Sequence, residues 1–133
     1  MPTFTIGDYD FGVDPDASHI NISSGKIDIT IVGRKELVES LWDDDDHPWS
    51  WLVYPPKIYL TDVPINLGGD GFQRDITEDD LDEYDIAIYV MKHCDILPCR
   101  VTLRDGLLTI RGNVHEIAKQ PYDFHVEFAA PSA

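Results

Sequence analysis

The segment from residue 42 to residue 54 combines the two kinds of side chain that most often form protein interfaces. Four consecutive carboxylates are followed within a few residues by indole and phenol rings. Carboxylates attract and orient a basic partner, whereas tryptophan and tyrosine supply the large contact areas that anchor it. A run of acids is also typical of a solvated loop, and tryptophan is usually part of a core. The candidate partner-binding residues in this segment are Trp42, Asp43, Asp44, Asp45, Asp46, Trp49, Trp51 and Tyr54.

A second acidic segment, residues 75–85, contains seven carboxylates among eleven residues. Such crowding costs self-repulsion and produces a strong negative potential. If the two acidic segments share one face of the protein, the combined patch would match the phosphates of nucleic acid in sign and could cover the basic cleft of a nuclease. The candidate steering charges in this segment are Asp79, Asp80, Asp82 and Glu83.

Two groups of residues have metal-binding side chains without a metal-binding spacing. The first is a loop that contains the four aspartates Asp8, Asp10, Asp14 and Asp16. Its glycine is misplaced for an EF-hand calcium loop, and His19 occupies the position of the bidentate glutamate. The second group lacks the paired spacing of a structural zinc site and consists of His93, Cys94, Cys99 and His115. We therefore expect no metal and no cofactor.

Residues that could catalyse a reaction are present without a recognisable catalytic arrangement. The thiols and histidines named above could form a Cys-His nucleophilic pair, but no third group or oxyanion loop completes a site. The glycine-rich turn at residues 67–71 lacks the Lys-Ser/Thr pair of a phosphate-binding loop. We expect that the protein is not an enzyme. Cys94 and Cys99 are expected to be free thiols, the alternative being a local bridge across the turn between them.

Three of the ten cations, Arg100, Arg104 and Arg111, fall on two segments that are expected to pair as strands. In that pairing Arg100 faces Arg111, and like charges that face each other across a sheet repel. Side chains on a neighbouring strand, Asp123, His125 and Glu127, are expected to neutralise them. The alternative interpretation is a local site for an anion.

The composition limits the class of protein and the kind of partner. The chain has 133 residues with 25 Asp and Glu against 10 Lys and Arg, and its net charge is −15. A hydrophobic fraction of 43% indicates a folded chain, and the length predicts a single domain over residues 1–133. The charge argues against nucleic acid and membrane as partners and favours a basic protein. Because the sequence has neither a signal-peptide pattern nor an apolar run of membrane-spanning length, we expect a cytoplasmic protein.

The element that the sequence defines best is a hairpin around Asp105-Gly106, which separates two alternating runs. Residues 85–94, apolar on both faces, predict a central strand, and residues 122–128 predict an alternating one. These segments together predict an antiparallel meander. The cross-strand pairs expected for the hairpin are Arg104 with Leu107, Leu103 with Leu108, Thr102 with Thr109, Val101 with Ile110, and Arg100 with Arg111.

Further strands and two helices follow from shorter patterns. Alternation predicts strands over residues 3–6, 26–32 and 57–61. Residues 34–42 predict a short amphipathic helix, and Thr77 followed by acids is typical of the start of a second helix. The expected fold class is α+β, mainly β: an antiparallel sheet meander with one or two short helices. The apolar side chains expected to face the core from the two helices are Leu37, Val38, Leu41 and Trp42, and Leu81 and Tyr84.

A small, acidic, β-rich chain with aromatic and acidic loops and no catalytic motif resembles the immunity proteins that bacteria make against their own polymorphic toxins. The resemblance is one of general character over the whole chain. It implies a tight inhibitor of a cognate toxin, often a nuclease. Two other classes stay open: a carbohydrate-binding or small-ligand-binding β-domain, because tryptophan and aspartate together suit sugar rings, and a structural subunit that assembles through an exposed edge strand.

Overall fold

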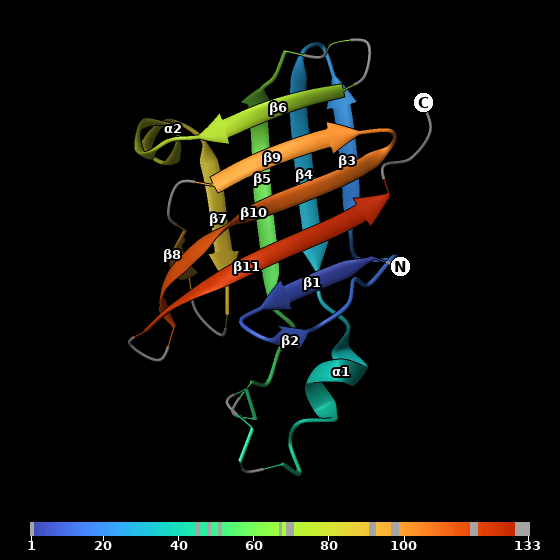
Figure 1. The fold of residues 1–133 in the computed structure, drawn as a ribbon, viewed down its shortest axis with the longest axis vertical. Coiled ribbons are helices and arrows are strands. Elements are labelled where there is room, and N and C mark those ends of the chain that lie inside the picture. Colours follow the sequence, from blue (N-terminus) through green and yellow to red (C-terminus); the bar gives the residue numbers. More distant parts are fainter. Residues whose placement is uncertain are drawn as a thin grey trace.

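Alternating apolar residues divide the chain into antiparallel strands that form two layers (Figure 1). The strands of one layer, which we name sheet A, run across those of the other, sheet B. The computed structural model describes the backbone over residues 2–44, 46–47, 49–50, 52–66, 68, 71–90, 93–96, 99–117 and 120–129, and the side chains of these residues except 93–96, 114–117, 120–122 and 129.

Sheet A has the strand order β6-β9-β10-β11-β1-β2, and every neighbouring pair is antiparallel. The central part of this sheet, β9-β10-β11, is the antiparallel meander expected from the sequence. The strands of sheet A are β1 (Thr3–Ile6), β2 (Tyr9–Asp10), β6 (Gly71–Ile76), β9 (Cys99–Arg104), β10 (Leu107–Ile117) and β11 (Gln120–Ala129).

Sheet B has the order β3-β4-β5-β7-β8 and is likewise antiparallel. The bulge between β4 and β5 contains Asp62, which has a positive φ of 52° and donates its backbone N–H to Asp28 Oδ1 at 2.9 Å. The strands of sheet B are β3 (His19–Ser23), β4 (Lys26–Val32), β5 (Lys57–Pro64), β7 (Asp85–Tyr89) and β8 (His93–Ile96).

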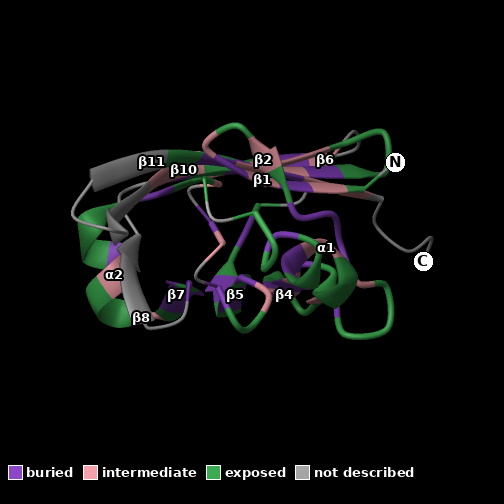
Figure 2. Cartoon of the chain, turned by 90° about the horizontal axis from the view of Figure 1, so that it is seen from below, coloured by how far each residue is buried: buried purple, intermediate pink, exposed green. Residues whose placement is uncertain are grey.

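Strand β10 pairs with strands of both sheets. Up to Arg111 it pairs with β9, and from Val114 it pairs with β8, where Val114 lies opposite Ile96. Gly112 stands between the two pairings, and a Cβ atom there would lie 2.5 Å from the Cβ of Cys99. Only glycine therefore fits where β10 passes the first residue of β9. The consequence is that the two layers are continuous along one side, beside which α2 lies (Figure 2).

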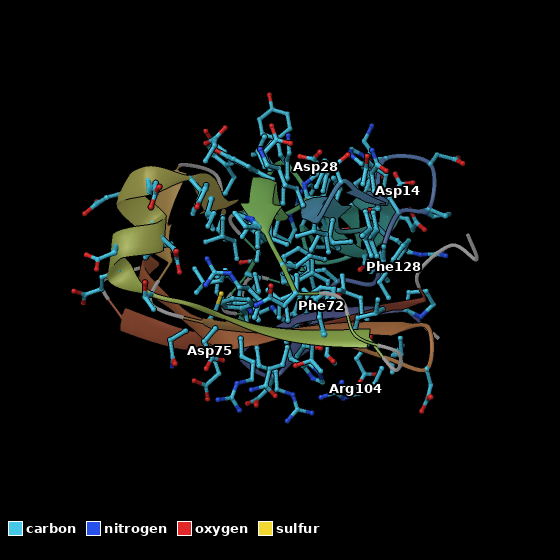
Figure 3. All side chains as sticks on the ribbon, turned by 90° about the horizontal axis from the view of Figure 1, so that it is seen from above. Asp14, Asp28, Phe72, Asp75, Arg104 and Phe128 are labelled. Atoms are coloured by element: carbon cyan, nitrogen blue, oxygen red, sulfur yellow. The ribbon has the colours of Figure 1, made fainter. Side chains whose placement is uncertain are left out.

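The core lies between the two layers. Side chains that alternate along β4 and β11 point inward, as the sequence pattern predicted: Ile29 and Ile31 are at most 1% exposed, and Phe124 and Val126 at most 2%. Phe72 and Phe128 also lie on the inner side of sheet A (Figure 3). The buried side chains of both sheets form one hydrophobic cluster, and its burial is the main favourable contribution to folding.

The hairpin between β9 and β10 has the predicted register at every pair from Arg104 opposite Leu107 to Arg111 opposite Arg100. Its turn residues Asp105 and Gly106 have φ values of 52° and 79°. Positive φ at both central positions defines the type I′ turn, which matches the twist of paired strands and favours the Asp-Gly sequence. The local chemistry of two residues therefore determines the register of the whole hairpin.

Residues 85–89 form a central strand, as predicted, with β5 on one side and β8 on the other, but the predicted extent to residue 94 and the predicted place in the meander are wrong. The chain turns back after Tyr89, so β7 and β8 are separate strands that pair with each other, Tyr89 opposite His93. Strand β7 belongs to sheet B, so it is not part of the meander. A segment that is apolar on both faces has the same pattern whether it forms one long strand or two that turn back.

Strand β6 was not predicted, since its composition resembles that of a loop.

The two helices are short. The first, α1 (Lys35–Glu39), ends earlier than predicted; Val38 and Leu41 are buried, but Trp42 lies outside the helix and is 46% exposed. The second, α2 (Glu78–Glu83), begins where Thr77 was predicted to cap it, and Thr77 accepts a hydrogen bond from the Asp80 N–H. Among the described residues, no helix is long and apolar enough to cross a bilayer.

Candidate functional site

The α1–β5 loop, residues 40–56, contains most of the residues selected from the sequence. Its described part is a succession of turns in which a backbone N–H donates to the carbonyl three residues earlier: Asp44 to Leu41, His47 to Asp44, and Ser50 to His47. These hydrogen bonds constrain the backbone of the described part of the loop. Asp45 and Trp51, two of the predicted binding residues, lie outside the described residues.

Buried side chains anchor the α1–β5 loop to the core. Leu41, Trp49 and Leu52 are 6%, 3% and 0% exposed, and the Trp49 ring lies edge-on to Phe11 with centroids 6.1 Å apart. Trp49 was selected as an anchor for a partner, but its ring is buried against Phe11 and presents little surface to one. In the structure, the buried Trp49 ring attaches the loop to the core.

Hydrogen bonds and an aromatic contact also hold the α1–β5 loop in place. The Trp42 indole N–H donates to the Leu52 carbonyl at 2.6 Å, which joins the two arms of the loop. His47 lies edge-on to the Tyr9 ring at 4.9 Å and accepts a hydrogen bond from the Trp49 N–H through Nδ1. The Tyr9 hydroxyl in turn donates to the Leu37 carbonyl in α1.

The outer side of the loop exposes large apolar side chains. Trp42, Val53 and Tyr54 are 46%, 49% and 68% exposed. Only two further large apolar side chains are exposed among the described residues, Tyr89 at 39% and Leu107 at 42%. Tyr89 lies opposite Lys57, the residue that follows the loop, so it belongs to the same end of the molecule. We name Trp42, Val53 and Tyr54, together with Asp43, Asp44 and Asp46, the loop surface.

Among the described residues, no side chain pairs with the carboxylates of the loop surface. Asp43, Asp44 and Asp46 are exposed. Within the described part of the chain, no ion pair or side-chain hydrogen bond involves any of the three. Their charge is therefore available to an incoming partner, in the same loop as the exposed rings of Trp42 and Tyr54.

Asp80, which was selected as a steering charge, has a structural role instead. It is 8% exposed, and its carboxylate accepts hydrogen bonds from the Arg74 guanidinium at 2.9 Å and from the Thr77 N–H at 2.8 Å. Arg74 also donates to the Pro64 carbonyl, so the Arg74–Asp80 ion pair connects β6, β5 and α2. Burial opposes ionisation, but the bonds from Thr77 and Arg74 outweigh it and lower the pKa of Asp80.

The other candidate acids of α2, Asp79, Asp82 and Glu83, are exposed but far from the loop surface. Strand β5 begins at Lys57, directly after the loop, and ends at Pro64, where Arg74 connects it to α2. Eight residues of strand span roughly 25 Å. The two acidic segments therefore lie at opposite ends of β5 (Figure 1) and form two separate negative surfaces.

A stacked tyrosine pair lies beside the loop surface on the outer face of sheet B. The rings of Tyr59 and Tyr89 are 5.9 Å apart between centroids, and Lys57 Nζ lies 5.7 Å from the Tyr59 centroid. Burial, followed by hydrogen bonds with Tyr89 and Asp85, raises the pKa of Tyr59 to about 12. Sequence reasoning did not select Tyr89, because the apolar run around it predicted burial on both faces.

The remaining candidate groups from the sequence have structural explanations or lie outside the described side chains. Asp10 accepts hydrogen bonds from the Phe4 and Gly12 N–H groups, and Asp14 accepts from those of Asp16 and Ala17, so both carboxylates shape their own loop. Within the described part of the chain, no three potential ligands gather as a metal site would require.

Cys99 carries a free, buried thiol, as the sequence predicted. Burial, with a smaller contribution from the charge of Asp75, raises the pKa of this thiol to about 12, so it is protonated and a poor nucleophile. The side chains of His93, Cys94 and His115 lie outside those described.

Comparison of the chain with models of protein families, with curated proteins and with solved structures finds no match. The function must therefore be inferred from the site itself. The loop surface combines the exposed rings of Trp42 and Tyr54 with carboxylates that make no ion pair among the described residues, and exposed aromatic rings are typical of a protein-binding surface.

Replacing Asp80 with Asn should destabilise the fold by about 2 kcal/mol near neutral pH, because Arg74 loses its charged partner in a largely buried position. A lowered pKa means that the ionised carboxylate stabilises the folded state above the pKa of the unfolded chain, and that this contribution disappears as the pH falls through the folded pKa. The stability difference between wild type and Asp80→Asn should therefore shrink on acidification. Denaturant titrations over a pH series measure it.

The matched control for that measurement is Asp82→Asn, which removes the same charge from an exposed position of the same helix. It should change stability by less than about 0.5 kcal/mol at every pH. Equal effects of the two substitutions would contradict the structural role of Asp80.

Proposed function

We propose that this chain is a binding protein whose loop surface docks a basic protein partner. One observation supports this most strongly: three of the five exposed large apolar side chains of the described residues lie in one loop, beside three unpaired carboxylates. Isolated exposed apolar side chains are common on soluble proteins, but a group of them in one loop is typical of an interaction site.

Trp42 is suited to anchor a partner because its ring is held in place before binding, by the bond from its indole N–H to the Leu52 carbonyl. Tyr54 is the more exposed of the two rings, at 68%. A side chain that is already ordered loses little conformational entropy on binding, which leaves more of its contact energy for affinity. Tryptophan and tyrosine are also among the residues most often found as binding hot spots.

The charges of the loop surface indicate the nature of the partner. Asp43, Asp44 and Asp46 attract a basic surface and accelerate its association, and the net charge of −15 adds to this attraction over longer distances. A toxin that binds nucleic acid would present such a basic surface. More specifically, we propose that the chain is a cytoplasmic immunity protein that inhibits a cognate bacterial toxin, for instance a nuclease. This agrees with the general resemblance of the sequence to immunity proteins of bacterial toxins.

Self-assembly through an edge strand is less well supported than docking by the loop surface. The edge strands β2, β3 and β6 contain two, five and six residues. Short edges offer few unpaired backbone groups to a second copy. A carbohydrate-binding role would use the exposed rings of the same loop, so binding of a basic protein and binding of glycans are alternatives that experiment separates.

Expression of the reading frame next to the gene for this chain tests the immunity proposal directly. The proposal predicts that the neighbouring product arrests growth when expressed alone, and that co-expression of this chain restores growth and yields a stoichiometric complex. A neighbouring product that is harmless and does not bind this chain would contradict the immunity function, and saturable binding on a glycan array would favour the carbohydrate alternative.

Charge removal in the loop tests how the partner is recognised. Combining Asp43→Asn, Asp44→Asn and Asp46→Asn should lower the association rate for the basic partner roughly tenfold at low ionic strength, because steering by these carboxylates is lost. The difference should shrink as salt is added, since salt screens exposed charges. Stopped-flow or surface-binding kinetics measure both effects.

The matched control neutralises the same number of charges on α2, through Asp79→Asn, Asp82→Asn and Glu83→Gln. This control should change the association rate by no more than about twofold, because α2 lies at the other end of β5. An equal decrease for both variants would mean that the net charge, and not the loop surface, steers the partner.

A further inference from the structure

The outer face of sheet A carries a concentration of arginine that contrasts with the acidity of the rest of the chain. Three of the five arginines, Arg100, Arg104 and Arg111, lie on β9 and β10. Their neighbours Val101 and Ile110 are buried, so alternation along the strands places the three guanidinium groups on the outer face. Arg104 and Asp75 both point away from the core on that side (Figure 3).

Two of these arginines face each other. Arg100 and Arg111 are direct cross-strand partners on exposed positions. Like charges in this arrangement destabilise a sheet unless an acid neutralises them. Asp75 does so for Arg100, with an Nε to Oδ1 distance of 2.7 Å. Among the described residues, Arg111 has no ion-pair or hydrogen-bond partner.

The acids expected to neutralise Arg111 contact other groups. Its partner across β11 is His125, and His125 Nε2 lies 3.4 Å from a Glu127 carboxylate oxygen. Asp123 accepts a hydrogen bond from the Asn113 side-chain amide. Arg111 thus makes no ion pair with a described residue, although the Asp123 carboxylate lines a hollow with it. A violation of the pairing rule of this kind is typical of a functional position.

A hollow of about 260 Å³ lies between these arginines. All of its lining side chains can donate hydrogen bonds, and none is an acid: Gln73, Arg100, Thr102, Thr109 and Arg111. The register places Gln73 beside Thr102 and Thr102 beside Thr109, so the amide and the hydroxyls form one row next to the row of arginines. The hollow is smaller than most pockets for whole drug-sized ligands, and its size suits a single anionic group.

A second hollow, of about 500 Å³, adjoins the first at Arg111. Unlike the first hollow, it is lined by an acid, and its polar side chains Asn113, Asp123 and His125 include hydrogen-bond acceptors as well as donors. A ligand with its anionic group in the first hollow would extend past Arg111 into the second, where hydroxyl groups of its body find acceptors.

We propose that the hollow between Arg100 and Arg111 binds the phosphate of a small phosphate monoester, whose polar body lies in the adjoining hollow of Asn113, Asp123 and His125. Guanidinium groups bind phosphate oxygens in pairs, and Arg111 offers all its donors while Arg100 offers those that do not contact Asp75. The Thr102 hydroxyl can donate to a remaining oxygen, whereas the Thr109 hydroxyl donates to the Thr102 carbonyl. A polyanion such as nucleic acid requires a longer track of cations and is repelled by the net charge of −15. This proposal is independent of the function proposed for the loop surface.

Isotope-detected NMR titration of the full chain tests this site with inorganic phosphate and with ribose 5-phosphate, at ionic strength held constant with chloride. We expect saturable shifts at the backbone amides of β9 and β10, with a Kd of roughly 1 mM or tighter for ribose 5-phosphate. Inorganic phosphate should bind about tenfold more weakly, because it makes no contacts in the second hollow. Equal affinities would overturn the assignment to a monoester, and linear shifts without saturation would overturn the site.

Arg111→Gln and Arg104→Gln form a matched pair, since both remove one arginine from the same face and only Arg111 lines the hollow. Arg111→Gln should weaken phosphate binding about tenfold or more, and Arg104→Gln by no more than about twofold. The unliganded Arg111→Gln variant should melt at the same temperature as wild type or higher, because repulsion with Arg100 is relieved. Similar losses in both variants would mean that only the general charge of the face attracts phosphate.

Discussion

The pairing of β10 with both β9 and β8 is the constraint on which the rest of the structure depends. It makes the two sheets continuous on one side, so that their inner faces enclose one hydrophobic cluster. Gly112 permits this path, since any larger residue would collide with Cys99 where β10 passes β9. Once the layers are joined in this way, α2 lies at one end of β5 and the α1–β5 loop at the other. The surfaces available for binding are thereby separated in space.

The charges behind the net value of −15 have different roles in different parts of the fold. Part of it is structural, as in Asp80, which supports the contact of α2 with β5 and β6 through Arg74. Part is unpaired and lies next to exposed rings in the loop surface. The outer face of sheet A is mixed, with three arginines alongside Asp75, Asp123 and Glu127, and Arg111 lines a hollow there without an ion pair among the described residues. The two binding surfaces that we propose thus differ in charge, in shape and in the kind of ligand that each would attract.

Local patterns in the sequence predicted the parts of the fold that depend on neighbouring residues. The Asp105-Gly106 turn specified the register of the β9–β10 hairpin, and alternation specified β1, β4 and the inward face of β11. The division of residues 85–94 into β7 and β8 was missed, because a doubly apolar segment fits either arrangement. In the α1–β5 loop, no periodicity distinguishes the buried Trp49 from the exposed Trp42. Whether the acidic segments meet depends on the path of the chain through both sheets, which no local pattern reveals.

The central claim is that a partner binds at the loop surface, and hydrogen exchange of the chain with and without its bound partner tests it most directly. Our account predicts that amide protection on binding is concentrated in residues 40–56 and in the adjoining ends of β5 and β7 around Lys57 and Tyr89. The amides of α2 and of the β9–β10 hairpin should exchange at unchanged rates. Protection at α2 or on sheet A, with none in the α1–β5 loop, would contradict the account.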